Sequence, residues 1–125
     1  MTPSKLGKYG EKLAARYLRK NGYRIVCKNY VCPFGEIDII AKNKTHLVFC
    51  EVKTRTDSEN LKKYGRPARA VNADKRRHIL LSARDYLRHA NNRLLQRIDI
   101  IEVYVSPESK HKYRIEHIPG AFGAD

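Results

Sequence analysis

The sequence has few of the features that mark a membrane or secreted protein. No apolar run approaches the roughly 18–20 residues of a membrane-spanning helix, and the first eight residues lack the apolar stretch of a secretory signal. Cysteine is scarce, and its three residues among 125 are an odd number that gives no disulfide framework. We therefore expect a cytoplasmic protein whose cysteines stay reduced.

Several motifs that would indicate a particular chemistry are also missing. The chain has no glycine-rich phosphate loop and no nucleotide-binding fingerprint, and no motif supports a Ser–His–Asp triad. A zinc site is disfavoured because Cys27, Cys32, Cys50 and His46 contain no Cys-x-x-Cys pair, so buried strand cysteines are the ordinary interpretation. No internal repeat is evident, and the length fits one domain, residues 1–125.

Acidic residues are half as frequent as basic ones. The chain has 13 Asp and Glu against 26 Lys and Arg, a net charge of +13, and its hydrophobic content of 42% suits a globular fold. Such a basic surface attracts polyanions, and we expect the partner to be nucleic acid. An anionic membrane is disfavoured because no basic amphipathic helix with an aromatic apolar face is evident. A basic protein without a polyanionic partner is the plain alternative.

The apolar pattern predicts the element order α-β-β-β-α-β-β. A first helix is expected over residues 6–20, with Ser4 as its cap and Asn21-Gly22 as its stop. Strands are expected at 23–30, 35–41, 47–53, 97–105 and 113–118, and a second helix at about 68–89, after Pro67. A strand–helix–strand connection normally gives right-handed parallel pairing. We therefore expect an α/β fold with a mixed sheet flanked by helices.

Charged residues occupy positions of equal parity in the second and third predicted strands. Side chains alternate across a strand, so Glu36 and Asp38 share one face of the second strand, and Glu51 and Lys53 share one face of the third. A hairpin that closes around Asn43-Lys44 would gather all four on one side of the sheet.

In that register, Asp38 would lie opposite Phe49 and Glu36 opposite Glu51. Asp38 and Glu51 would then be diagonal neighbours with Cα atoms about 7–8 Å apart. This separation allows two carboxylates to hold one divalent cation.

Two carboxylates beside a lysine suit the metal-dependent hydrolysis of a phosphodiester. The reaction needs charge neutralised on the phosphate and an activated water, and a divalent metal supplies both. Mg²⁺ prefers oxygen ligands, which Asp38, Glu51 and the backbone carbonyl of Val52 could provide, and Mn²⁺ is the alternative metal. Lys53 could orient or deprotonate the water, or stabilise charge on the phosphate. From spacing alone, the acids could instead face water or pair with Arg97 or Lys75, but they lie in otherwise apolar strands, share parity and oppose the charge of the chain.

Basic residues follow the hairpin along the chain. Residues 54–66 have little apolar content and are expected to form a loop beside the charged strand ends, either a binding loop or a solvated linker. Lys75 lies on the flank of the second helix's apolar face, where it either extends its ammonium group to solvent or reaches a buried anion. The predicted nucleic-acid contacts are Arg55, Lys62, Lys63, Arg66, Arg69, Lys75 and Arg76.

The hairpin and its surroundings also resemble a known family. The block Gly35-Glu36-Ile37-Asp38, followed by Glu51-Val52-Lys53 within α-β-β-β-α-β, resembles the PD-(D/E)XK nuclease superfamily and its restriction-endonuclease-like fold. With Gly10-Glu11, Lys75 and Arg97-Ile98-Asp99-Ile100, the pattern is similar to the bacterial YraN family, which in turn resembles archaeal Holliday-junction resolvases. The resemblance covers about residues 5–105 and leaves a C-terminal strand and tail at 106–125.

The resemblance implies a Mg²⁺- or Mn²⁺-dependent endonuclease that cuts DNA, with branched or junction DNA as an extrapolation. It implies a catalytic set of Asp38, Glu51 and Lys53, assisted by Glu36 and by Glu11, which matches a first-helix glutamate of the resolvases. From spacing alone, Glu11 is an ordinary surface acid near a helix start. The sequence departs from the superfamily pattern at Ile37, where the name-giving proline is absent.

A non-catalytic DNA- or RNA-binding protein with the same fold is the alternative function. RNA ranks behind DNA because few exposed aromatic residues for base stacking can be identified. Symmetric cutting of two strands needs two active sites, so a homodimer is one assembly to expect.

Overall fold

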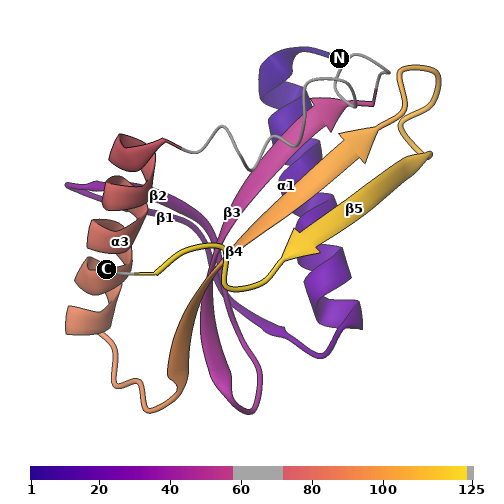
Figure 1. Cartoon of the computed structure of the whole chain (residues 1–125). Coiled ribbons are helices and arrows are strands. Elements are labelled where there is room, and N and C mark those ends of the chain that lie inside the picture. Colours follow the sequence, from indigo (N-terminus) through magenta and orange to yellow (C-terminus); the bar gives the residue numbers. More distant parts are fainter. Residues whose placement is uncertain (58–71, 124–125) are drawn as a thin grey trace.

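The order of helices and strands confirms the α/β fold that the sequence predicts. The computed structural model describes residues 1–57 and 72–123. Figure 1 shows the elements, whose bounds are α1 (Pro3–Lys20), β1 (Arg24–Cys32), β2 (Gly35–Lys42), β3 (His46–Thr56), α3 (Ala73–Arg88), β4 (Leu95–Val105) and β5 (Tyr113–Ile118). The arrangement is consistent with a restriction-endonuclease-like core.

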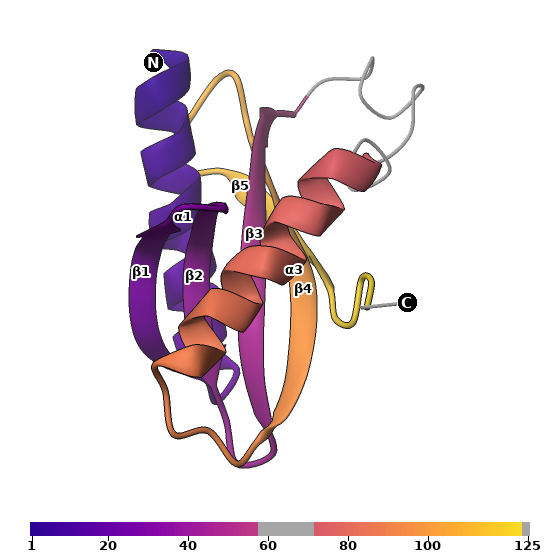
Figure 2. The ribbon, with the colours of Figure 1, turned by 90° about the vertical axis from the view of Figure 1, so that its left-hand side faces the viewer.

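The five strands form one mixed sheet in the order β1-β2-β3-β4-β5. Neighbouring strands are antiparallel except for β3 and β4, which are parallel. A parallel pair needs a long crossover connection, and here that connection contains α3. Figure 2 shows α3 in front of the sheet and α1 behind it, so the two helices cover opposite faces.

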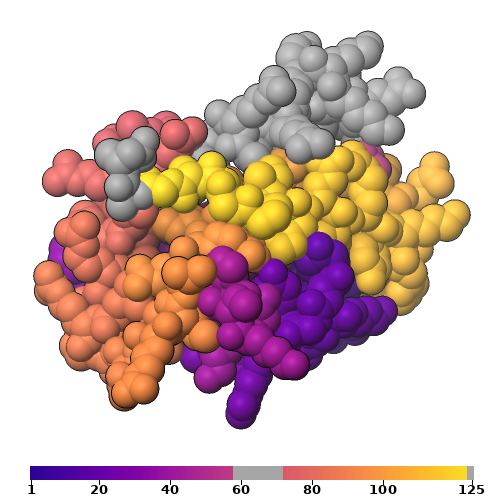
Figure 3. All heavy atoms as spheres, turned by 60° about the horizontal axis from the view of Figure 1, so that its bottom comes forward, coloured from indigo at the N-terminus to yellow at the C-terminus, as the bar shows by residue number. Residues whose placement is uncertain are grey.

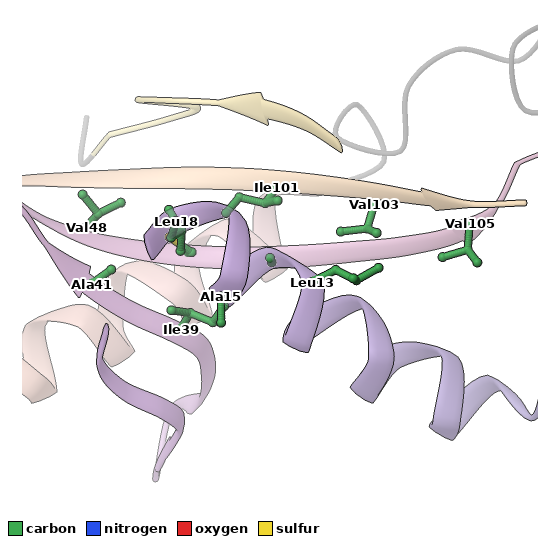
Figure 4. Packing of buried hydrophobic residues seen from close by; sticks show 11 residues of the cluster. Leu13, Ala15, Leu18, Ile39, Ala41, Val48, Ile101, Val103 and Val105 are labelled. Atoms are coloured by element: carbon green, nitrogen blue, oxygen red, sulfur yellow. The ribbon is translucent and has the colours of Figure 1, made fainter. Parts of the chain in front are cut away.

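Each helix buries its own apolar cluster against the sheet. On one face, Leu13, Ala15 and Leu18 of α1 pack against β2, β3 and β4, as Figure 4 shows. On the other face, Ile79 and Ala83 of α3 join a second cluster with β2 and β3. Because both faces are covered, β2 and β3 are nearly continuous apolar runs. A charged side chain within these two strands is therefore conspicuous.

Helix α1 begins earlier than predicted. Its N-cap is Thr2, whose hydroxyl accepts a hydrogen bond from the Lys5 N–H at 3.2 Å. Pro3 takes the first helical position, where a missing N–H costs nothing, so the predicted Ser4 cap is wrong. The predicted stop is confirmed, since Asn21 is the C-cap and Gly22 has a φ of +87°.

The predicted hairpin register is wrong by two residues. Strands β2 and β3 pair from Lys42 with Leu47 to Ile39 with Cys50. The turn centres on residues 44–45, because the Asn43 side-chain oxygen accepts hydrogen bonds from the N–H groups of the two residues that follow Lys44. Asparagine therefore opens this turn rather than lying at its centre. Asp38 does not oppose Phe49, and Glu36 pairs with Val31 of β1 rather than with Glu51.

The segment predicted as a loop after Lys53 begins as strand. Residues Thr54 to Thr56 pair with Val103 to Val105 of β4, which extends β3 beyond its predicted end. The described part of α3 begins at Ala73, and Asn72 is its N-cap, so the predicted start near residue 68 is wrong. Residues 58–71, including Pro67, lie outside the described ranges.

Candidate active site

The candidate active site lies where β2 and β3 separate. The last paired residues are Ile39 and Cys50, and continuing the register would set Asp38 level with Glu51. The Val52 N–H does not pair with the backbone of β2. It donates a hydrogen bond to Oδ2 of the Asp38 side chain at 2.7 Å. We call this point the fork. In a strand, the N–H and C=O of one residue face the same neighbour, so the Val52 carbonyl also faces the fork.

Glu51 is the buried acid of the fork. It is 6% exposed, and two lysines approach its Oε1 atom. Lys53 Nζ lies 3.7 Å from this atom. Lys75, which belongs to α3 on one face of the sheet, places its Nζ 3.2 Å from the same atom. Of the two sequence interpretations of Lys75, reaching a buried anion is the one that the structure shows.

Glu11 and Glu36 extend the acidic cluster toward the other face. The side-chain amide of Asn29 donates to Glu36 Oε1 at 2.8 Å and to Glu11 Oε2 at 3.3 Å when its nitrogen is turned toward them. Glu11 reaches this position because Gly10 lets α1 lie directly against β3, where any Cβ on Gly10 would overlap the side chain of Thr54. Helix α1 thus contributes an acid to the fork.

The predicted charges are brought together, but not in a row on one side of the sheet. Glu36 is linked through Asn29 to α1, whereas Glu51 meets Lys75 of α3. These two helices cover opposite faces (Figure 2). The one-sided arrangement predicted from parity is therefore wrong. The charged groups gather at the end of the β2–β3 pairing, within reach of both faces.

The carboxylates repel one another. Burial raises the pKa of Asp38 to about 7, with the negative charge of Glu51 adding to the shift and the Val52 N–H opposing it. Burial also raises the pKa of Glu11, and the charge of Glu36 acts in the same direction. A cation between these groups would relieve the repulsion.

The donor set suits a hard divalent cation. Within residues 1–57 and 72–123, no group of three His, Cys, Asp or Glu side chains could hold a metal ion. Mg²⁺ does not require such a group, because it usually takes one or two carboxylates and completes its shell with waters and substrate phosphate. Asp38, Glu51 and the Val52 carbonyl provide a set of this kind.

Comparison with known proteins places the chain in a family. The model of the uncharacterised protein family UPF0102 matches residues 10–103. A UPF0102 protein of Caldanaerobacter subterraneus subsp. tengcongensis is 45% identical over 118 residues, which are 94% of this chain and 93% of the relative. The chain belongs to the UPF0102 family.

Two further UPF0102 proteins are similar over almost the whole chain. The protein of Syntrophotalea carbinolica is 42% identical over 121 residues, which cover 96% of this chain and 93% of the relative. The protein of Clostridium acetobutylicum is 41% identical over 121 residues, which cover 94% of this chain and 93% of the relative. The matched stretch 10–103 includes every acid and lysine of the fork. The family description names no activity, so the nuclease assignment is a proposal.

The predicted nucleic-acid contacts of this UPF0102 protein are described only in part. Arg55 is exposed near the end of β3, and Arg76 is exposed on α3, where its guanidinium lies 5.6 Å from the centre of the Phe122 ring. Four others, Lys62, Lys63, Arg66 and Arg69, lie outside the described residues. In the described residues, no helix is long and apolar enough to cross a membrane.

Sequence reasoning missed Asn29. This residue lies inside β1 with a φ of +52°, a conformation that asparagine tolerates better than most residues. In the sequence, Asn29 stands out only as an asparagine within a strand-forming run. That feature does not indicate that its side chain joins Glu11 to Glu36.

Arg97 pairs with Asp99 and not with the acids of the β2–β3 hairpin, so that interpretation of the sequence is wrong. Arg97 Nε instead lies 2.8 Å from Oδ1 of fully buried Asp99, which also accepts hydrogen bonds from His117 and the Gly120 N–H. Burial alone would raise the pKa of Asp99, but these bonds outweigh it and hold the pKa below its ordinary value. This network ties β4 to β5 and the C-terminal segment.

Proposed function

We propose that this UPF0102 protein is a metal-dependent endonuclease that hydrolyses phosphodiester bonds in DNA. The observation that carries the proposal is the fork itself, where Asp38 and Glu51 hold two carboxylates together beside lysines. Acids arranged against their own repulsion, in a chain of net charge +13, indicate a site for a cation and an anionic substrate.

The roles follow from the contacts at the fork. Asp38, Glu51 and the Val52 carbonyl would hold Mg²⁺ or Mn²⁺, which when bound supplies charge neutralisation and an acidified water. The Val52 N–H keeps the Asp38 carboxylate in position. Lys53 would orient or deprotonate the attacking water, or stabilise charge on the phosphate. Glu11 and Glu36, joined by Asn29, would assist from the α1 side.

DNA would reach the fork along basic side chains. Arg55, Lys75 and Arg76 are the described members of the predicted contact set. Lysine and arginine contacts to phosphate position a nucleic acid without reading its sequence. Branched or junction DNA is the substrate that the resemblance to resolvases favours.

A second candidate function is DNA binding without cleavage. One observation favours it, because the ammonium groups of Lys53 and Lys75 both lie within 4 Å of the Glu51 carboxylate and can balance its charge. In this alternative the lysines would be permanent partners of Glu51 and would never give way to a cation. The protein would then bind DNA in a salt-sensitive manner and cut it with no metal.

The two functions are separated by a cleavage assay with matched variants. Linear, flapped and four-way-junction DNA would be incubated with the protein and Mg²⁺ or Mn²⁺. We expect cleavage that falls at least about 100-fold in Asp38→Asn and Lys53→Ala, because each removes a group that acts on the reacting phosphate or water. The exposed residues Glu108 and Lys44 provide controls, and Glu108→Gln and Lys44→Ala should cut like the wild type.

Cleavage that persists in Asp38→Asn would indicate a contaminant or another site and would refute the assignment. Salt-sensitive binding with no cleavage of any DNA by the wild type would support the binding-only alternative.

A further inference from the structure

Helix α1 exposes a stripe of basic side chains along its solvent face. The stripe consists of Lys5, Lys8, Lys12, Arg16 and Arg19, all of them exposed. Their spacing of three or four residues keeps them within about 80° of one another around the helix axis, at 3.6 residues per turn. Among the ion pairs of the described residues, none involves these five. We call this set the α1 stripe.

The α1 stripe leads to the fork. Glu11, the acid that α1 contributes to the fork, is partly buried and lies about 60° around the helix axis from Lys8, at the edge of the α1 stripe, with buried Ala15 between them. Lys8 precedes Glu11 by one turn, and Lys12 follows it directly. A polyanion lying along the α1 stripe would therefore pass beside the acidic cluster.

The dimensions suit a DNA backbone. From Lys5 to Arg19 the α1 stripe is about 21 Å long, at 1.5 Å per helical residue. That length corresponds to about six base steps of B-DNA, in which phosphates of one strand follow at about 3.4 Å along the axis. Five cations over this length, none of them in an ion pair with another described residue, would give a sequence-independent contact with one duplex.

Helix α3 presents a second basic surface on the opposite face of the sheet. Lys75, Arg76 and Arg77 lie in its first turns, and Lys75 reaches Glu51 at the fork. Figure 2 shows the sheet between the two helices. Because the surfaces lie on opposite faces, a straight duplex bound along one does not extend along the other. A branched DNA, whose arms diverge from one point, can reach both.

We propose that the α1 stripe is a second duplex-binding surface, so that branched DNA is held by one arm on α1 and another on α3. The position of the branch point at the fork rests on the proposed function. The binding surface itself does not, and it can be tested without cleavage. Two surfaces that engage one DNA together bind it more tightly than either does alone.

The test measures DNA binding in EDTA by the full chain. A four-way junction is compared with a linear duplex of the same total length, over a series of salt concentrations. The α1-stripe variant carries Lys8→Gln, Lys12→Gln and Arg16→Gln. The control variant carries Lys42→Gln, Lys44→Gln and Arg93→Gln, which remove the same charge at the end of the sheet away from the fork. That end, where the Leu95 N–H donates to the Thr45 carbonyl, faces the viewer in Figure 3.

We expect the wild type to prefer the junction and the α1-stripe variant to lose this preference. Its junction affinity should fall at least about tenfold, and the salt slope of log K should drop by about 2.7 for three lost phosphate contacts. Its affinity for linear duplex should fall by less than about threefold, because α3 still binds. The control variant should keep the preference for the junction, and thermal melting should show all three proteins folded.

The inference is overturned if the α1-stripe variant binds the junction with the affinity and salt slope of the wild type. The inference is also overturned if the control variant loses as much affinity for the junction, since the lower net charge alone would then explain the loss. A wild type that never cuts DNA, together with a loss of junction preference in the α1-stripe variant, would reject the proposed function and leave the inference standing.

Discussion

At the scale of single residues, Glu51 determines the charge balance of the fork. Its carboxylate is buried, and the nearer of its two cations, Lys75 Nζ at 3.2 Å, comes from a different element than Lys53. A buried charge is costly unless it is paired. The two lysines therefore balance the charge of Glu51. A divalent cation bound at the fork would take their place, and the Lys75 ammonium would then be released toward DNA.

Replacing Lys75 separates these roles. In Lys75→Ala we expect Mn²⁺ to bind about tenfold more tightly, because one competing positive charge leaves Glu51. Junction DNA should bind more weakly in the same variant, since a phosphate contact is lost. Isothermal titration calorimetry and a DNA-binding assay measure the two effects. Arg76→Ala, next to Lys75 and exposed, is the control and should weaken DNA binding only. Equal Mn²⁺ affinity in the two variants would contradict this account of Glu51.

Asp38 gives a pH dependence with a defined sign. Its pKa rises from an ordinary 3.8 to about 7 in the folded protein, so between these values the folded state binds more protons than the unfolded state. The free energy of unfolding of metal-free protein should therefore fall as pH rises from about 4 to about 7. Asp38→Asn removes the loss of stability that comes from ionising Asp38, and its side-chain oxygen can still accept the hydrogen bond of the Val52 N–H.

The measurement is urea unfolding in EDTA at pH 5 and pH 8. Relative to the wild type, Asp38→Asn should gain about 2–3 kcal/mol between the two pH values, from about 1.4 kcal/mol per pKa unit. Glu108→Gln, an exposed acid, should show no such gain. A stability difference between Asp38→Asn and wild type that is independent of pH would contradict the raised pKa.

At the scale of elements, the contact of α1 with β3 positions the fork. Gly10 allows the helix backbone to lie against Thr54, one residue past Lys53, and the next residue on the helix is Glu11. The close approach thus fixes the α1 side of the acidic cluster relative to β3. The helix could not lie there with a side chain at position 10.

Two glycines of the same helix test this contact. Gly10→Ala should destabilise the protein by about 1–3 kcal/mol, the usual cost of overpacking a core, and Thr54→Ala should partly restore it. Gly7→Ala meets no atom within 4 Å and should stabilise by up to about 1 kcal/mol through helix propensity. Thermal or urea unfolding measures both. Similar effects of the two substitutions would show that the close approach does not matter.

Element order could be predicted from the sequence, and strand pairing only partly. Helix and strand periodicities are local, as are stops such as Asn21-Gly22, so the α/β order was predicted correctly. The hairpin register depends on whether Asn43 opens the turn or lies in its middle, and both choices fit the same composition. The strand at Thr54 to Thr56 exists because β4 pairs with it, a partner about 50 residues away that local patterns do not reveal.

At the scale of the whole molecule, the fold brings together groups that the sequence keeps apart. Parity predicts that Asp38 and Glu51 are neighbours, and the β2–β3 register, continued by one residue, sets them level with each other. Glu11 was identified only through the family resemblance, because nothing in a helix pattern indicates which strand a flanking acid reaches. The role of Asn29 depends on the packing of the β1–β2 hairpin against α1 and could not be predicted. Whether these residues bind metal and cut DNA stays a prediction.

The most direct test of the central claim is a crystal structure with Mn²⁺, located by its anomalous scattering. We expect one strong peak at the fork, within bonding distance of Asp38 and Glu51, with Lys75 moved away from Glu51. Asp38→Asn crystals grown in the same Mn²⁺ should lack the peak. A wild-type structure without Mn²⁺ at the fork, with Lys53 and Lys75 still on Glu51, would contradict the metal-dependent site and favour DNA binding without cleavage.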